Sequence, residues 1–197
     1  KLDIDSVMHC FGLATVTESK SEDYQPGDLV FGNTGCSTLS YVDEKRMKSL
    51  SVIPKELIDG FSPEEFVYLM NNGLAAYGGI SVMGNLTKED TVVVSTAAGA
   101  TGLLVLQILR HRGINAVGLT SSNKLQYVRD LCGKAVDYKD HKALVAALKT
   151  TKFKYYFDNV GEWLLDEIIR FIQPKGVISL CGATSNYLNV LIDNDAV

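Results

Sequence analysis

The chain has 197 residues, of which 46% are hydrophobic and 21% are charged, and its formal net charge at pH 7 is −4. This composition is typical of a globular protein with room for one full domain and part of another. No apolar run reaches the roughly 18 residues that span a bilayer. Because an acidic chain without a basic stripe is also unlike a nucleic-acid-binding protein, we expect neither a membrane nor a nucleic acid as its partner.

The four cysteines are scattered and show none of the spacings that close a zinc site. They are Cys10, Cys36, Cys132 and Cys181. We therefore expect no bound metal, and reduced thiols as in a cytoplasmic protein. The first residues lack the features of a secretory signal and contain no initiator methionine, so we expect the sequence to be part of a longer protein.

Short apolar stretches broken by turn signals fill residues 7–54 and predict a small β structure. The segment Ser62-Pro63-Glu64-Glu65 then predicts the start of a helix, with an N-cap serine, a proline at the first helical position and a glutamate three residues after the cap. A second helical stretch carries Tyr77 and leads to a break at Gly84-Asn85. We place the boundary between two domains after residue 82.

From residue 91 onward, predicted strands alternate with predicted helices, which is the pattern of parallel crossover units. The strands are expected at residues 91–95, 115–120, 135–138, 155–158 and 176–180. The helices between them are expected at residues 102–112, 124–131, 141–149 and 162–172. Five strands separated by helices predict an α/β fold with a doubly wound parallel sheet.

A short loop with two glycines joins the first of these strands to its helix. Such glycines let the backbone approach a pyrophosphate, and the first amides of the helix face the anion. Because Ala97 stands at the first glycine position of the usual fingerprint, the loop alone is also compatible with a tight turn that binds nothing. Its place in a crossover unit favours a nucleotide site. The candidate residues are Gly99, Ala100, Thr101 and Gly102.

The residues after the second strand bear on the choice of cofactor. An NAD site usually carries an acidic residue there, which holds the ribose hydroxyls, but residues 118–124 contain none. Lys124 and the neighbouring serines could pair with a 2′-phosphate, which a carboxylate would repel. The stretch therefore favours NADPH over NADH. The alternative is that Lys124 is an exposed lysine without a partner.

The turn Asn159-Val160-Gly161 follows the fourth strand, so it belongs to the same edge of the sheet as the glycine loop. Its simpler interpretation is an asparagine-containing turn with no ligand. No Ser/His/Asp grouping and no pair of carboxylates shares a predicted edge, so the sequence offers no residues for hydrolase chemistry.

Taken together, these motifs resemble the zinc-independent branch of the medium-chain dehydrogenases/reductases, closest to the prostaglandin and alkenal/one double-bond reductases. Residues 95–102 resemble the alanine-rich cofactor loop of that family, and residues 156–161 resemble its most distinctive signature. The resemblance implies part of a GroES-like β-barrel domain with a linking helix at residues 1–82. It also implies an NADP-binding Rossmann domain at residues 83–197, without the carboxyl-terminal part of the family.

The resemblance also assigns residues to the nicotinamide half of the cofactor and to its 2′-phosphate. One segment is similar to that which lines the nicotinamide ribose and ends in an active-site tyrosine. It consists of Cys181, Gly182, Ala183, Thr184, Ser185, Asn186 and Tyr187. By this resemblance Tyr187 orients the ribose or the substrate enolate, Tyr138 and Lys124 meet the 2′-phosphate, and Asn159 lies on the nicotinamide side.

The implied reaction is hydride transfer from NADPH to the β-carbon of an α,β-unsaturated ketone or aldehyde, in a cytoplasmic protein that is a homodimer at full length. Three features depart from the family. Ala75 stands where the family usually has threonine, the segment before Lys124 is one residue short, and the family's first β strands and carboxyl-terminal part are missing from this sequence. Two alternatives therefore stay open. One is a quinone oxidoreductase of the same superfamily, and the other is a non-catalytic homologue that binds the cofactor.

Overall fold

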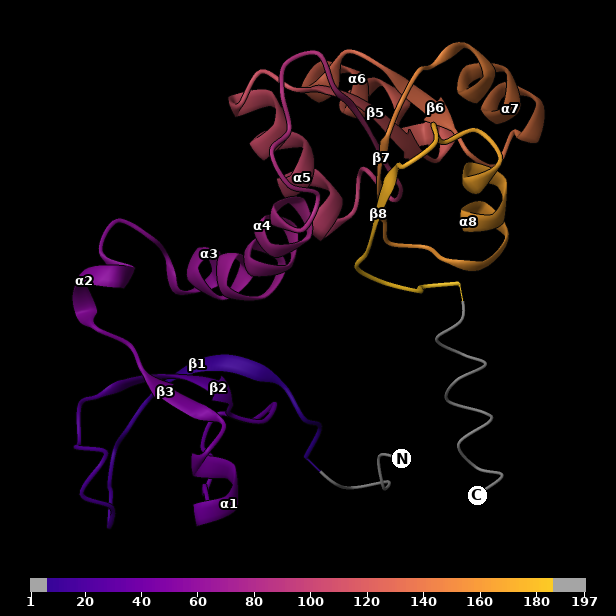
Figure 1. The fold of residues 1–197 in the computed structure, drawn as a ribbon. Coiled ribbons are helices and arrows are strands. Elements are labelled where there is room, and N and C mark those ends of the chain that lie inside the picture. The colour runs from indigo at the N-terminus through magenta and orange to yellow at the C-terminus, as the bar shows by residue number, and fades with distance from the viewer. Residues whose placement is uncertain (1–6, 186–197) are drawn as a thin grey trace. The chain divides into compact units, whose positions relative to one another are not determined.

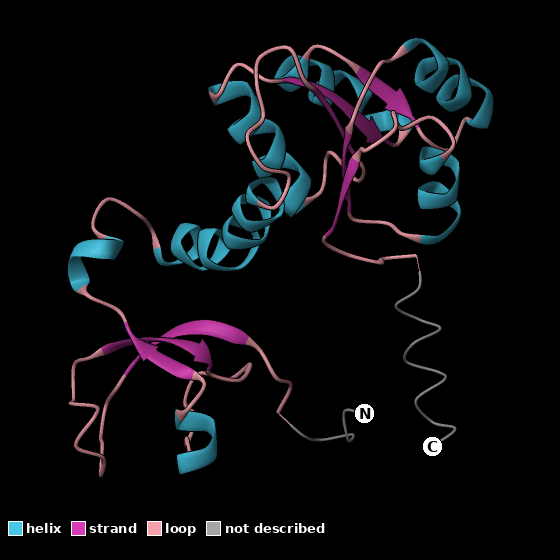
Figure 2. Cartoon of the chain, viewed as in Figure 1, coloured by secondary structure: helices cyan, strands magenta, loops and turns pink. Residues whose placement is uncertain are grey.

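The computed structural model describes residues 7–185 (Figures 1 and 2). The chain divides into two compact units, which meet between residues 71 and 72. The division into domains expected between residues 82 and 83 stays a prediction. Within the described range, no helix is both long and apolar enough to cross a membrane.

The first unit is built on a three-stranded antiparallel sheet, as expected for a small β structure. Its strands follow the order β1 (Phe11–Thr15), β2 (Leu29–Asn33) and β3 (Leu50–Val52). Its helical segments are α1 (Glu44–Met47), α2 (Lys55–Ile58), α3 (Pro63–Tyr68) and the π-helical turn η1 (Leu69–Gly73), which continues from α3 into the second unit.

Helix α3 begins where the sequence predicts. The Ser62 hydroxyl accepts a hydrogen bond from the Glu65 amide at 3.2 Å, and the Glu65 carboxylate accepts one from the Ser62 amide at 2.9 Å. These two bonds satisfy amides that the first turn of a helix leaves without a partner. The helix buries Phe66, whose ring lies edge-on against Phe31 of β2 with the centroids 6.2 Å apart.

The second unit contains a five-stranded parallel sheet in the order β6-β5-β4-β7-β8. Its strands are β4 (Thr91–Val94), β5 (Asn115–Thr120), β6 (Ala135–Asp137), β7 (Tyr155–Asp158) and β8 (Val177–Leu180). Its helices are α4 (Leu74–Ser81), α5 (Ala100–His111), the 3-10 turn η2 (Ser122–Lys124), α6 (Leu125–Cys132), α7 (His141–Thr150) and α8 (Glu162–Ile169).

The strand order confirms the predicted doubly wound sheet. After β6, at one edge, the chain returns through α7 to pair β7 with β4, so the direction of winding reverses between β4 and β7. The β-branched run of β4 lies at the centre of the sheet, and Val92, Val93 and Val94 are fully buried. All five predicted strands are present, with ends that differ from the expected ones by at most one residue.

The helices cover both faces of the sheet (Figure 1). On one face, α4, α5 and α6 contribute side chains to a core that includes Ile80, Leu106 and Val128. On the other face, α7 and α8 contribute Leu144 and Leu164 to a second core. Because both faces are buried, the strands show continuous apolar runs rather than alternation.

The second strand contains a glycine at a point of close packing with α6. A Cβ atom at Gly118 would lie 2.3 Å from Cγ1 of Val128 and 2.9 Å from Cβ of Ala97. Both distances are far shorter than a van der Waals contact, so a larger residue at this position forces the helix away from the sheet. Gly118 therefore sets how closely α6 packs on β5.

We predict that Gly118→Ala lowers the free energy of unfolding by roughly 1–3 kcal/mol, the usual cost of overpacking a core. Val128→Ala removes the clashing methyl group and costs a similar amount by leaving a cavity. The double variant should cost clearly less than the sum of the two, because each change relieves the other. Urea unfolding of the four proteins measures this coupling, and simple additivity would contradict the packing argument.

Helix α8 begins with two residues in the left-handed region of backbone space. Gly161 has φ +76°, which glycine adopts freely, but the next residue is Glu162 with φ +46°. A non-glycine residue pays roughly 1 kcal/mol or more for this conformation. The turn after β7 therefore carries local backbone strain.

We predict that Glu162→Gly raises the free energy of unfolding by about 0.5–1 kcal/mol, because glycine relieves this strain. Glu162→Ala is the matched control, since it removes the same carboxylate and keeps the strained backbone. Thermal unfolding of both variants separates the two effects. An equal gain from alanine would mean that the charge of Glu162, and not its backbone, destabilises the turn.

Candidate functional site

The candidate site lies at the carboxyl edge of the parallel sheet. All five strands end at this edge, and the loops that follow them hold the residues singled out in the sequence. Open sheets of this kind bind ligands there, beside the point where the strand order reverses. Of the predicted site residues, Asn186 and Tyr187 lie outside the described residues.

The loop after β4 forms a cradle that only glycine permits. A Cβ atom at Gly102 would lie 2.3 Å from the carbonyl oxygen of Thr96, and one at Gly99 would lie 2.7 Å from the Thr96 methyl carbon. Thr96 itself has φ +47°, an unusual conformation for a β-branched residue. The strained turn thus brings the backbone of α5 close against the end of β4.

Helix α5 starts directly from this cradle. Gly99 is its N-cap and provides no side chain to satisfy the first amides, and the first helical bond runs from the Leu103 amide to the Gly99 carbonyl at 2.9 Å. Amides of a first turn that lack a side-chain cap bind anions well, with help from the helix dipole. The cradle and the helix start therefore fit a pyrophosphate group.

One polar contact at the start of α5 was not predicted. The hydroxyl of Thr101 donates a hydrogen bond to the side-chain oxygen of Asn72 at 3.1 Å. Asn72 belongs to the π-helical turn η1, so this bond fixes the segment before α4 against the first turn of α5. In the sequence, only the polar character of Asn72, directly before Gly73, hinted at a contact of this kind.

The loops after β5 and β6 lie side by side. The Tyr138 amide donates to the carbonyl of Thr120 at 3.2 Å, and Lys124 follows Thr120 by four residues at the exposed turn η2. The half-buried Tyr138 ring packs against Trp163 at the start of α8, with the centroids 6.2 Å apart. Tyr138 thus lies beside the end of β5, and the role of Lys124 and Tyr138 toward a 2′-phosphate stays a prediction.

The loops after β4 and β7 are joined by two short hydrogen bonds. The Asn159 amide donates to the Ser95 hydroxyl at 2.8 Å, and the Asn159 side-chain nitrogen donates to the Ser95 carbonyl at 2.7 Å. Both residues are buried. The side chain of Asn159 is thus occupied by Ser95, and its role at this point is to tie the two central strands together.

The most connected group of the site is the carboxylate of Asp158, the last residue of β7. Its Oδ1 atom accepts hydrogen bonds from four donors, and its Oδ2 atom is buried without a partner. The donors are the Tyr156 hydroxyl at 2.8 Å, the Val160 amide at 3.0 Å, the Gly161 amide at 3.1 Å and the Ser95 hydroxyl at 3.2 Å. The sequence analysis did not identify this hub.

The charge of Asp158 acts on two neighbouring groups. Burial, and after it the negative charge of Asp158, raises the pKa of the Tyr156 hydroxyl well above its ordinary value. The same two causes, in the same order, raise the pKa of the Cys181 thiol. Both groups therefore stay protonated at neutral pH, and Tyr156 acts as a permanent hydrogen-bond donor.

The loop after β8 is fastened to the loop after β7. The amides of Cys181 and Gly182 donate to the Asp158 carbonyl at 2.8 and 3.1 Å. The hydroxyl of Thr184 donates to the Asn159 carbonyl at 3.0 Å, and that of Ser185 donates to the Val160 carbonyl at 2.6 Å. The structure thus brings residues 181–185 together with the loop of Asn159, and their role toward the nicotinamide stays a prediction.

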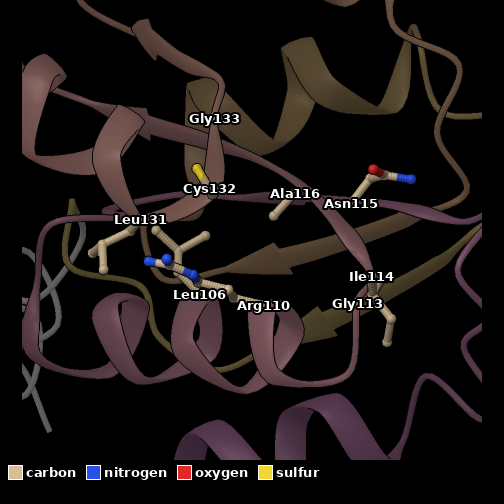
Figure 3. Close-up of a pocket in the computed structure, with 9 residues that line it drawn as sticks. All are labelled: Leu106, Arg110, Gly113, Ile114, Asn115, Ala116, Leu131, Cys132 and Gly133. Carbon is tan, nitrogen blue, oxygen red and sulfur yellow. The ribbon is translucent and has the colours of Figure 1, made fainter.

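A separate pocket lies at the amino ends of the strands, opposite the candidate site. It is formed where β5 begins, between the last turns of α5 and α6 (Figure 3). Its lining consists of Leu106, Arg110, Gly113, Ile114, Asn115, Ala116, Leu131, Cys132 and Gly133. Because it is remote from the carboxyl ends of the strands, it contains none of the predicted site residues. Burial raises the pKa of the Cys132 thiol in this pocket, so the thiol stays protonated at neutral pH.

Comparison with known families agrees with this arrangement. A family profile described as "Zinc-binding dehydrogenase" matches residues 100–195. Within residues 7–185, however, no three His, Cys, Asp or Glu side chains gather where they could hold a metal ion.

Two curated relatives carry the likeness across most of the chain. Prostaglandin reductase 1 of Oryctolagus cuniculus is 31% identical over 185 residues, which cover 89% of this chain and 51% of that protein. The NADP(+)-dependent 2-alkenal reductase of Nicotiana tabacum is 32% identical over 186 residues, which cover 90% of this chain and 52% of that protein. The chain thus spans about half the length of these relatives.

Solved structures show the same fold. CurA from Vibrio vulnificus matches with a TM-score of 0.73 and 25% identity, over 94% of this chain and 55% of that one. The quinone oxidoreductase of Escherichia coli, solved with NADPH, matches with a TM-score of 0.69 and 18% identity, over 93% of this chain and 59% of that one. With these likenesses, and with the doubly wound sheet and glycine cradle, the chain belongs to the zinc-independent branch of the medium-chain dehydrogenases/reductases.

Proposed function

We propose that the protein uses NADPH to reduce the carbon–carbon double bond of an α,β-unsaturated ketone or aldehyde. Two observations support NADPH as the cofactor. One is the glycine cradle at the start of α5, and the other is the loop after β5, which contains a lysine and no acidic residue. The substrate class is supported by the names of the prostaglandin and 2-alkenal reductases to which the chain is similar.

In this proposal the AMP half of the cofactor lies over β4, β5 and β6. The backbone of residues 99–102 would hold the pyrophosphate, because these residues form the start of α5, where the N-cap Gly99 provides no side-chain cap. Lys124 and Tyr138 would hold the 2′-phosphate, a charge-assisted contact in the case of the lysine. NADH has a hydroxyl at that position, so it would gain little from Lys124.

The nicotinamide half would then lie over β7 and β8, beside Asn159 and the loop of residues 181–185. NADPH supplies a hydride when it is bound. The hydrogen bonds from this loop to the carbonyls of Asn159 and Val160 hold the wall of the site in place before any ligand arrives. Such preorganisation is what allows a site to stabilise developing charge. We propose that Tyr187 orients the ribose or the substrate enolate.

The setting of the protein belongs to the same proposal. We propose a cytoplasmic location and a homodimer for the full-length protein, with a small enone or enal as the substrate. The four free cysteines are in keeping with a reducing compartment. Among residues 7–185, β8 is the last strand of the sheet on its side, and another strand could pair with its outer edge.

Quinone reduction is the second candidate, and the observation that favours it is the fold shared with the E. coli quinone oxidoreductase. A non-catalytic role is the third, and the observation that favours it is Ala75 in place of the family's usual threonine. Incubating the full-length protein with NADPH and either a 2-alkenal or a para-quinone separates the three. The saturated aldehyde as product supports the proposed function, whereas quinol as product, or NADPH binding without oxidation, would replace it.

The cofactor assignment predicts that Lys124→Ala weakens NADPH binding by about tenfold or more and changes NADH binding little, because a charge-assisted contact to the 2′-phosphate is lost. Fluorescence of Trp163, the single tryptophan, reports both titrations. Lys149→Ala removes the same charge from an exposed position at the far end of α7 and is the matched control. Equal losses for NADPH and NADH would exclude this role for Lys124.

A further inference from the structure

Asp158 carries a buried charge without a counter-ion among the described residues. Its side chain is 0% exposed, and the ion pairs found in residues 7–185 instead join Glu167 to His141 and Arg170. Four hydrogen-bond donors converge on its Oδ1 atom, and none of them carries a positive charge. Burying a negative charge without a counter-ion costs free energy, so a functional role would explain why this one is buried.

The position of this charge relative to the proposed cofactor follows from the topology. Asp158 ends β7, beside the point where the strand order reverses. In a doubly wound sheet the two halves of a dinucleotide lie on either side of that point. The glycine cradle and Lys124 mark the AMP half over β4 and β5, which leaves β7 and β8 for the nicotinamide half. This step rests on the proposed function.

The charge of Asp158 also acts on one group within β7 and on one group in the loop after β8. It contributes, after burial, to the raised pKa of Tyr156 within β7 and of Cys181 after β8. The loops that carry Asn159 and Cys181, beside which the nicotinamide half would lie, are both bonded to Asp158 or to its neighbours. The charge therefore reaches the region where the nicotinamide ring is expected.

We propose that the Asp158 carboxylate makes the protein bind NADP+ more tightly, relative to NADPH, than a neutral residue would. The nicotinamide ring is positively charged in NADP+ and neutral in NADPH, so a nearby negative charge favours only the oxidised form. Asp158 is fully buried and touches neither form, and its effect is carried by the electric field through a poorly solvated region. Favouring the oxidised form makes bound NADPH a better hydride donor.

The hydrogen-bond network alone does not require a charge. An asparagine at this position still offers an oxygen to the amides of Val160 and Gly161, so the turn can be kept while the charge is removed. Asp158→Asn therefore isolates the electrostatic part of the role. A purely structural Asp158 would affect both forms of the cofactor alike, since both would lie against the same loops.

The experiment is calorimetric titration of the full-length protein with NADPH and, separately, with NADP+, for the wild type and for Asp158→Asn. We expect the substitution to weaken NADP+ relative to NADPH by roughly threefold to tenfold, the effect of one unit charge across several ångströms of partly desolvated protein. Ser185→Ala is the matched control, because it removes a neutral donor that fastens the same loops and does not bond to the Asp158 carboxylate. It should weaken both forms by the same factor.

A second variant keeps the test open if Asp158→Asn does not fold. Tyr156→Phe removes one donor from the carboxylate and leaves the charge less neutralised, so the ratio should move the other way, toward NADP+. An unchanged ratio in the folded variants would overturn the inference and leave the proposed function intact. If the wild type binds neither nucleotide, the proposed function fails and the inference fails with it.

Discussion

The hydrogen bonds between Ser95 and Asn159 hold together the two strands on which the whole site depends. Strands β4 and β7 are neighbours in the sheet but are separated in the chain by three crossover connections, so no short loop fixes their ends relative to each other. The bonds of 2.7 and 2.8 Å replace such a loop. Both residues are buried, and hydrogen bonds between buried groups add rigidity to a site. The loops that follow β4 and β7 inherit this fixed spacing.

The second constraint is close packing of backbone against backbone. Gly102 allows the first turn of α5 to lie against the Thr96 carbonyl, and Gly118 allows α6 to lie against β5. A third glycine, Gly79 of α4, would meet the ring of Phe157 at 2.4 Å if it carried a Cβ atom. The strained backbone of Thr96 is tolerated because the tightly packed surroundings leave it no alternative. The anion-binding geometry of the cradle thus follows from packing.

Local patterns were enough to predict the sheet. The β-branched run at Val92–Val94 and the turn signals between the helices depend only on neighbouring residues, and the parallel order follows from alternating strands and helices. The capping box at Ser62 was predictable for the same reason. The short helices α1 and α2 and the π-helical turn were missed, because they contain too few residues to show a period.

The polar hub of the site could not be predicted in the same way. Sequence spacing places Asp158 and Ser95 at two strand ends, but only the strand order makes those ends adjacent. The contact of Thr101 with Asn72 likewise joins residues that no pattern relates. Asn159 was identified by its position after β7, yet its side-chain nitrogen donates to the Ser95 carbonyl. Any contact of Asn159 with a cofactor must therefore use another atom of this residue. Assigning a residue to an edge of a sheet is thus a weaker statement than assigning it a contact.

The arrangement of charge along the carboxyl edge gives these separate features one physical meaning. Lys124 places a positive charge at the end of the site that follows β5, and Asp158 places a buried negative charge under the end that follows β7. NADP+ has the opposite polarity, with the anionic 2′-phosphate at one end and the cationic ring at the other. The neutral amides at the start of α5 lie between the two and suit the pyrophosphate. A site that is positive, neutral and negative in this order fits an NADP cofactor in one direction only, because a reversed cofactor would set like charges against each other at both ends.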